Sequence, residues 1–259
     1  MIVDLFGGPG GWDLGARSLG MDPIGLDADP DTCATRKAAG LRTMQVDLST
    51  FIGKPPTVLS AQVADLFQPW PEINLDSVEG LIASPPCPAF SMAGGGHGRA
   101  ELADLIGACE YHQAPDPTLS IVSLLLWMPI DWVLTHKPNW VAIEQVPPVA
   151  PFFEAVADML PYFGYYTWTG VVNAADYGCP QTRRRAILLA NRHRPVGAPA
   201  PTHAERPVDG LASWVTMGQA LNLSDDRKLV PGTYAATGGN RRLYSLDEPA
   251  PTIAFGHDI

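Results

Sequence analysis

The chain has 259 residues and a formal net charge of −10, with 25 glycines and 26 prolines. That length suffices for a full hydrophobic core, and the glycine and proline content stays below the share typical of disordered chains. The acidic balance excludes a protein that binds nucleic acid through overall positive charge. The excess acid lies in residues 1–150, with 7 Lys and Arg against 17 Asp and Glu, whereas residues 151–259 hold 10 of each kind. A local basic face remains, because residues 181–194 contain five arginines and no acid.

The N-terminus predicts a strand, a turn and a helix in succession. Residues 1–6 are mostly apolar, residues 7–11 are rich in glycine, and residues 12–19 continue in a helical pattern. This order opens a doubly wound sheet, and glycines in the turn let the backbone approach a ligand closely. Asp13 stands where a Gly-x-Gly-x-x-Gly frame starting at Gly8 requires its third glycine, which disfavours a nicotinamide cofactor.

A second apolar strand over residues 24–26 ends in Asp27. An acid at the tip of the second strand is where such folds hold ribose hydroxyls. Either Asp29 or Asp31 is expected to cap the helix predicted over residues 32–39. That leaves Asp27 available for a sugar.

Asp47 follows a third short strand and is expected to accept a hydrogen bond from an adenine amino group. Residues 50–76 read as an insertion, and Asp65 within it is the alternative candidate for that contact.

The segment Ser84-Pro85-Pro86-Cys87 comes directly after an apolar run, so a strand is expected to deliver the cysteine to its carboxyl end. The two prolines fix φ and favour extended geometry before them, which places the thiol on a stiff loop and predicts a nucleophile. A rigid turn with an inert thiol is the alternative interpretation.

Glycines at 94–96 and 98 follow this loop and suit a segment that closes over a ligand and excludes water. His97 and Arg99 are expected to reach phosphates, with no metal role for His97. A plain surface linker is the alternative.

Four segments together resemble motifs of the cytosine-C5 DNA methyltransferase family, in the family's order. They are residues 4–11, 85–91, 142–146 and 173–185, and Gln145 stands where the family usually has asparagine. The resemblance implies S-adenosylmethionine as cofactor, double-stranded DNA with a flipped cytosine as substrate, and DNA methylation of the kind found in restriction-modification. It implies cofactor contacts from Asp4, Phe6, Gly8, Gly10, Gly11, Asp27, Asp47 and Pro86.

The resemblance also implies the catalytic residues. The Cys87 thiolate adds to C6 of the cytosine, and Glu144 hydrogen-bonds N3 and the exocyclic amine; an ion pair at a strand end is the alternative for Glu144. Arg183 and Arg185 brace the flipped base and the active-site loop. In an extended segment Gln181 lies on the face of these two arginines and Arg184 points the other way. The contacts expected with DNA come from Ser91, Gln181 and Arg184.

The fold class predicted is α/β, a doubly wound and mostly parallel sheet of the S-adenosylmethionine-dependent methyltransferase type. Residues 1–194 form the catalytic and cofactor-binding domain, and residues 195–259 form a partial, irregular target-recognition region in which residues 246–253 resemble a family segment. The family's two last motifs have no counterpart before Ile259. The chain therefore reads as a truncated enzyme or as one half of a split enzyme completed by a second polypeptide.

Two alternatives remain open. A non-catalytic DNA-binding or regulatory homologue is favoured by Gln145 and by the missing motifs. An RNA cytosine-C5 methyltransferase is disfavoured, because the Cys-Phe-Thr signature of that branch is absent from the recognition region.

The four cysteines indicate a reducing compartment. They form no Cys-x-x-Cys pair, and no secretory leader precedes the first strand, so a cytoplasmic protein is expected. Cys33 and Cys179 are expected to be small buried side chains. The longest apolar stretch, residues 121–134, is interrupted by Pro129 and Asp131 and predicts a core helix, not a membrane span.

Overall fold

The structure is a computed structural model, and it describes residues 1–52, 78–86, 90, 100–206, 210–223, 228–229 and 244–252. Contacts divide the chain into two compact units, one formed by 1–170 with 186–198 and the other by 171–185 with 199–259. Residues 171–185, which the sequence prediction assigned to the catalytic domain, thus cluster with the second unit. The elements of the first unit and its sheet are β1 (Ile2–Leu5), α1 (Gly11–Ser18), β2 (Ile24–Asp27), α2 (Pro30–Ala38), β3 (Arg42–Gln45), β4 (Gly80–Ala83), α4 (Leu102–Glu110), α5 (Ile121–His136), β5 (Trp140–Gln145), α6 (Ala150–Met159), β6 (Tyr166–Asn173) and β8 (Arg184–Asn191).

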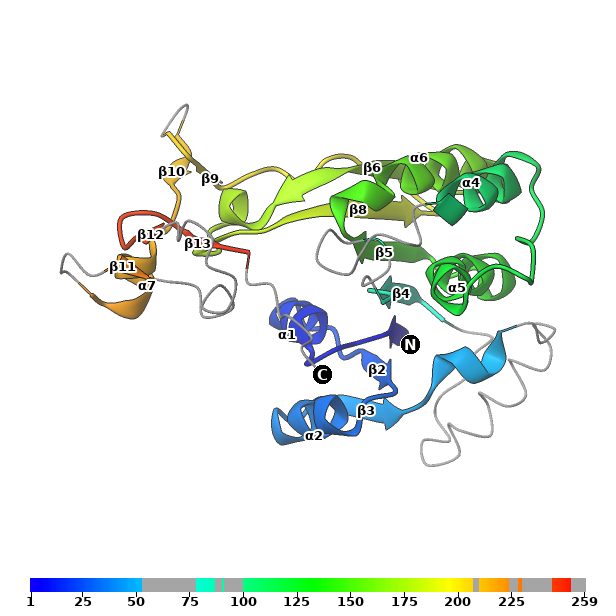
Figure 1. The fold of residues 1–259 in the computed structure, drawn as a ribbon, viewed down its shortest axis with the longest axis horizontal. Coiled ribbons are helices and arrows are strands. Elements are labelled where there is room, and N and C mark those ends of the chain that lie inside the picture. The colour runs from blue at the N-terminus through cyan, green and yellow to red at the C-terminus, as the bar shows by residue number, and fades with distance from the viewer. Residues whose placement is uncertain are drawn as a thin grey trace. The chain divides into compact units, whose positions relative to one another are not determined.

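The main sheet has the strand order β3-β2-β1-β4-β5-β8-β6. Strands β1 to β5 are parallel, with Leu5 opposite both Leu26 and Ala83, and β8 runs antiparallel to β5. Figure 1 shows α1 and α2 on one side of this sheet and α4, α5 and α6 on the other. The chain passes outward from β1 through β2 to β3 and then returns to β4 on the other side of β1. This reversal between β1 and β4 is the switch point at which doubly wound folds bind ligands, at the carboxyl ends of the strands.

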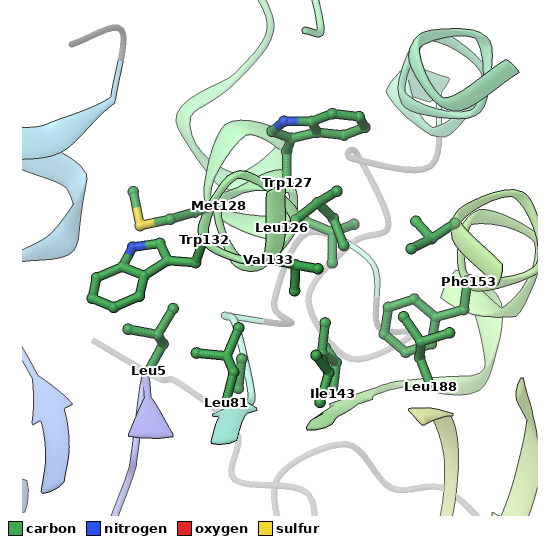
Figure 2. Packing of buried hydrophobic residues seen from close by; sticks show 14 of the residues in the cluster. Leu5, Leu81, Leu126, Trp127, Met128, Trp132, Val133, Ile143, Phe153 and Leu188 are labelled. Carbon is green, nitrogen blue, oxygen red and sulfur yellow. The ribbon is translucent and has the colours of Figure 1, made fainter. Parts of the chain in front are cut away.

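The hydrophobic core lies between the main sheet and helix α5. Trp127, Trp132 and Val133 of α5 are buried. Figure 2 shows Trp132 and Val133 on the side of α5 that faces the strand residues Leu5, Leu81 and Ile143, and Trp127 on the opposite side of the helix. The apolar run that predicts this helix is therefore a packing surface, and Ser120 caps its start by accepting a hydrogen bond from the Ser123 amide. None of the helices that the structure describes is long and apolar enough to cross a membrane.

The second unit contains short elements, as expected from its proline-rich sequence. Its parallel pair of β13 and β7 places Ala250 opposite Gln181, and its helix α7 has a capping box between Thr216 and Gln219. The elements are β7 (Gln181–Thr182), β9 (His203–Ala204), β10 (Ala212–Ser213), α7 (Met217–Leu221), β11 (Lys228–Leu229), β12 (Tyr244–Ser245) and β13 (Ala250–Pro251).

The predicted doubly wound α/β sheet is confirmed by this strand order and by the parallel register. Asp29 caps α2, as one of the two predicted alternatives, by accepting a hydrogen bond from the Thr32 amide at 3.0 Å. The expectation for the cysteines holds for Cys33, which is buried, and is wrong for Cys179, which is exposed. Cys179 follows the left-handed Gly178 at the end of a 3₁₀ turn, where the chain lies at the surface.

Candidate functional site

The glycine-rich turn between β1 and α1 depends on backbone conformations that side chains disfavour. Phe6, Gly8 and Gly10 all have positive φ, at 59°, 51° and 99°. A Cβ at Gly10 would lie 2.2 Å from Leu41, whereas a Cβ at Gly8 or Gly11 would meet none of the described atoms within 4 Å. The backbone at Gly8 and Gly11 is therefore open to a ligand, next to the first amides of α1.

Asp27 lies beside this turn at the end of β2. Its Oδ2 accepts a hydrogen bond from the Gly8 amide at 2.9 Å, and its Oδ1 accepts one from the Asp29 amide at 3.0 Å. The Gly7 amide donates to the Leu26 carbonyl at 3.0 Å. These hydrogen bonds fix the glycine-rich turn against the carboxyl end of β2.

Asp47 lies next to Asp27, because the Val46 amide donates to the Asp27 carbonyl at 2.8 Å. The Asp47 side chain is exposed and accepts a hydrogen bond from the Ser49 amide, at the start of a 3₁₀ turn. Its alternative, Asp65, lies outside the described residues.

Asp4, for which the resemblance implies a cofactor contact, lies in the carboxyl-terminal half of β1. Its side chain is fully buried beneath the turn, 3.9 Å from the Arg36 guanidinium, and a buried carboxyl there supports the turn from below. Asp13 is equally buried and forms an ion pair with Arg36 at 3.0 Å. The site that the sequence indicated therefore rests on a buried group of two acids and one base.

Arg36 is the residue of this group that sequence reasoning missed. Its Nη1 donates to the carbonyls of Gly7 at 2.8 Å and Gly8 at 3.2 Å, and its Nε donates to the Thr43 hydroxyl at 3.3 Å. A Cβ at Gly25 would lie 1.7 Å from Arg36. Glycine in the middle of β2 was the available signal, since such a glycine often marks a close approach by another group.

The Asp4 carboxyl is expected to give the protein a pH-dependent stability. Burial first and the Asp13 carboxyl second raise the pKa of Asp4 well above its usual range, and Arg36 opposes this only in part. Above about pH 4 the unfolded chain has released the Asp4 proton, whereas the folded state still holds it. The free energy of unfolding therefore falls as the pH rises from the pKa of Asp4 in the unfolded chain to its raised pKa in the folded state, by at most about 1.4 kcal/mol per pH unit.

Asp4→Asn should flatten this dependence, because an amide does not titrate. The check is urea unfolding of both proteins between pH 5 and 8, with the exposed Asp22→Asn as control. Parallel pH profiles for the parent and Asp4→Asn would contradict the assignment.

Residues 84–86, directly before the cysteine, form hydrogen bonds to β1 and α1 on one side and to β5 on the other. The Ser84 amide donates to the Leu5 carbonyl at 3.1 Å, and the Trp12 indole Nε1 donates to the Ser84 hydroxyl at 3.1 Å. On the other side, Gln145 Nε2 donates to the carbonyls of Pro85 at 2.9 Å and Pro86 at 3.4 Å.

Gln145 is buried, and its Oε1 accepts a hydrogen bond from the following Val146 amide. Gln145→Glu keeps the shape of the side chain and removes the donor that serves Pro85 and Pro86. We expect a loss of about 1–3 kcal/mol in the free energy of unfolding, because a buried carbonyl loses its partner. Chemical denaturation at neutral pH measures this, with Gln45→Glu on the exposed end of β3 as control. Equal stability of Gln145→Glu and the parent would show that the amide is dispensable.

Glu144 lies at the carboxyl end of β5, half-buried and opposite Ile187 of β8. The carboxyl ends of β1, β2, β4 and β5 meet at one edge of the sheet, so the structure brings the glycine turn, Asp27, Pro86 and Glu144 to the same edge.

Cys87 itself lies outside the described residues, as do Ser91, His97 and Arg99. The residues on either side of Cys87 are described in part. Pro86 is half-buried and bonded to Gln145, and Phe90 is fully buried in the core.

The arginine segment belongs to the second unit up to Arg185. Arg184 is exposed between the half-buried Arg183 and Arg185, as the spacing predicts, whereas Gln181 and Thr182 are both half-buried. Gln181 Nε2 donates to the Pro251 carbonyl at 3.2 Å, so its amide holds the 246–252 segment. The Thr182 hydroxyl donates to the Ala250 carbonyl at 3.2 Å and the Thr252 hydroxyl donates to the Thr182 carbonyl at 2.8 Å.

Comparison with known proteins matches these motifs to one family. The sequence model of the family described as C-5 cytosine-specific DNA methylase matches residues 1–208. The type II methyltransferase M.XorII of Xanthomonas oryzae is 28% identical, over 88% of this chain and 47% of the relative. M.HgiDI of Herpetosiphon aurantiacus is 26% identical, over 97% of this chain and 70% of the relative. M.AquIA of a Picosynechococcus species is 24% identical, over 78% of this chain and 76% of the relative.

The chain spans about half the length of some of these relatives, such as M.XorII. The family match nevertheless covers the glycine turn, the Pro-Pro-Cys segment, Glu144 and the arginine segment together. By this match, the chain belongs to the C-5 cytosine-specific DNA methylase family.

Proposed function

We propose that this chain is the catalytic and cofactor-binding part of a DNA cytosine-C5 methyltransferase, which transfers a methyl group from S-adenosylmethionine to C5 of a cytosine flipped out of double-stranded DNA. The observation that carries this proposal is the meeting of the glycine turn, Asp27, residues 84–86 before the cysteine and Glu144 at one edge of the sheet. Membership of the C-5 cytosine-specific family supports the same reaction.

The residues at the switch point fit the proposed cofactor. The open backbone at Gly8 and Gly11 and the amides at the start of α1 suit its polar amino-acid end. The Asp27 carboxylate suits the ribose hydroxyls, Phe6 and Asp47 suit the adenine, and Pro86 closes the site from β4. When bound, S-adenosylmethionine supplies an electrophilic methyl group.

The chain's own residues supply the activation of cytosine. The Cys87 thiolate adds to C6, and its electron pair makes C5 nucleophilic. The Glu144 carboxyl donates a hydrogen bond to N3 and accepts one from the exocyclic amine, and the proton shared with N3 offsets the negative charge that develops on the ring. After C5 gains its methyl group, a water molecule acting as base takes the C5 proton, the electron pair of the C5–H bond re-forms the C5–C6 double bond, and the C6–S bond breaks to release the Cys87 thiolate. Arg183 and Arg185 hold the base, and Ser91, Gln181 and Arg184 contact DNA.

The basic segment supports DNA binding on an otherwise acidic chain, since five arginines and no acid occur in residues 181–194. We propose that a second polypeptide, or a further stretch of the same protein, supplies the family motifs that have no counterpart up to Ile259. A role in restriction-modification is proposed from the type II relatives. The cytoplasm is the compartment proposed, because the four cysteines form no Cys-x-x-Cys pair.

Methyl transfer from labelled S-adenosylmethionine tests this proposal, assayed separately on DNA of mixed sequence and on transfer RNA, with and without the polypeptide encoded downstream. We expect label in DNA, as 5-methylcytosine, in at least the completed form. DNA binding without methyl transfer in both forms would favour a regulatory homologue, and label in transfer RNA but not DNA would favour the RNA-directed reaction.

A further inference from the structure

The segment 84–86 is tied to the two elements that flank the glycine turn. The Ser84 backbone is bonded to Leu5, the last residue of β1. The Ser84 side chain accepts the hydrogen bond from Trp12, which lies in the first turn of α1, 72 residues away in the sequence. The proposed cofactor turn and the proposed nucleophile segment are therefore linked through one side-chain contact as well as through the sheet.

The side chain of Trp12 has one polar atom, the indole Nε1, and the hydrogen bond to Ser84 uses it. An indole N–H can only donate, so it needs an acceptor such as the Ser84 hydroxyl when the ring is partly buried. Trp12 is half-buried, and it follows Gly11 directly, at the mouth of the glycine turn. Phenylalanine at this position would keep the ring and lose the link.

We expect the position of Ser84 to influence residue 87, which lies outside the described residues. Pro85 and Pro86 fix their φ angles and restrict the residue before each, so few rotatable bonds separate Ser84 from Cys87. Gln145 holds the carbonyls of both prolines on the opposite side. A shift of Ser84 therefore displaces Pro85 and Pro86 relative to the glycine turn, and we expect the thiol that follows them to be displaced too; a misplacement of about 1 Å can slow a reaction about 100-fold.

We propose that Trp12 is a positioning residue for the transfer step, because its hydrogen bond to Ser84 fixes the Pro-Pro-Cys segment relative to the glycine turn. This inference rests on the proposed function. Trp12 acts through Ser84 and is not itself a catalytic residue.

The test compares Trp12→Phe, Ser84→Ala and the double variant in single-turnover methyl transfer, using the chain completed by its downstream polypeptide. Each single variant should slow transfer about three- to tenfold, which corresponds to the loss of one hydrogen bond. The double variant should be no slower than the singles, because both remove the same bond. Ser84→Thr keeps a hydroxyl and should restore most of the rate. The KM values for cofactor and DNA should change less than twofold in all variants.

Multiplying effects in the double variant, or unchanged rates in the singles, would overturn the proposal. A rise in cofactor KM at constant transfer rate in Trp12→Phe would also overturn it, since Trp12 would then only line the cofactor site.

A second measurement separates this inference from the proposed function. In ¹⁵N-indole NMR spectra of the full chain, Ser84→Ala should move the Trp12 signal and speed its hydrogen exchange, and S-adenosylhomocysteine should shift that signal in the parent. If the parent transfers no methyl group in any form, the proposed function fails, and the inferred role in transfer fails with it. An indole signal that is unmoved by Ser84→Ala in an active protein overturns the inference alone.

Discussion

Cys87→Ser is expected to abolish the covalent complex between the completed protein and DNA that carries 5-fluorocytosine. With the parent protein and S-adenosylmethionine, this base should trap the Cys87 adduct. Its C5 carries fluorine in place of hydrogen, so there is no C5 proton for a base to remove and the thiolate cannot be eliminated. A free cysteine thiol has a pKa of about 8.5 and is partly ionised at neutral pH, whereas a serine hydroxyl is not ionised. Methyl transfer by Cys87→Ser should therefore fall on the order of 1,000-fold or more. DNA binding should remain, since phosphate contacts supply most of the affinity.

Cys179→Ser is the matched control, because it removes an exposed thiol and should leave the trapped complex intact. Cys109 is a poor competitor, since burial raises the pKa of its thiol to about 12. The complex is measured on a denaturing gel with labelled DNA, and DNA affinity is measured by fluorescence anisotropy. A trapped complex with Cys87→Ser, or an active parent that is never trapped, would show that the proline-framed cysteine is only a rigid turn.

Arg36→Met should destabilise the protein by about 3–5 kcal/mol, because it leaves the buried Asp13 carboxylate without its ion-pair partner. The same change removes the donors that serve the Gly7 and Gly8 carbonyls. Whole proteins are stable by only about 5–15 kcal/mol, so much of this variant should unfold at moderate urea concentrations. Arg36→Lys keeps the charge, but a single ammonium cannot serve Asp13 and both carbonyls, so an intermediate loss is expected.

Arg17→Met is the control, because its ion pair with Asp22 at 3.0 Å is exposed and should contribute no more than about 1 kcal/mol. Adding Asp13→Leu to Arg36→Met should recover part of the loss, since it removes the uncompensated charge. Urea unfolding followed by circular dichroism gives each free energy of unfolding. Equal midpoints for Arg36→Met and Arg17→Met would mean that Arg36 does not hold the glycine turn.

Much of the order of strands and helices, and the local chemistry of the turns, could be predicted from the sequence alone, whereas α4, α6 and β6 were not predicted. Alternating apolar strands and helices predicted the sheet, because hydrophobic periodicity and glycine positions are local properties of the chain. The same reasoning placed Asp27 at a strand end and Asp29 at a helix start, since each position depends on a few neighbouring residues. The family motifs were likewise readable, because each is a short contiguous stretch.

Which polar groups meet beneath and beside the site could be seen only in the folded protein. Arg36 reaches the Gly7 carbonyl over 29 residues, Gln145 reaches the Pro85 carbonyl over 60, and Trp12 reaches Ser84 over 72. No local pattern encodes such pairs, because the sheet brings distant segments together and burial then requires each polar group to find a partner. For the same reason Asp4, which the motif presented as a ligand contact, lies buried with Arg36 and Asp13.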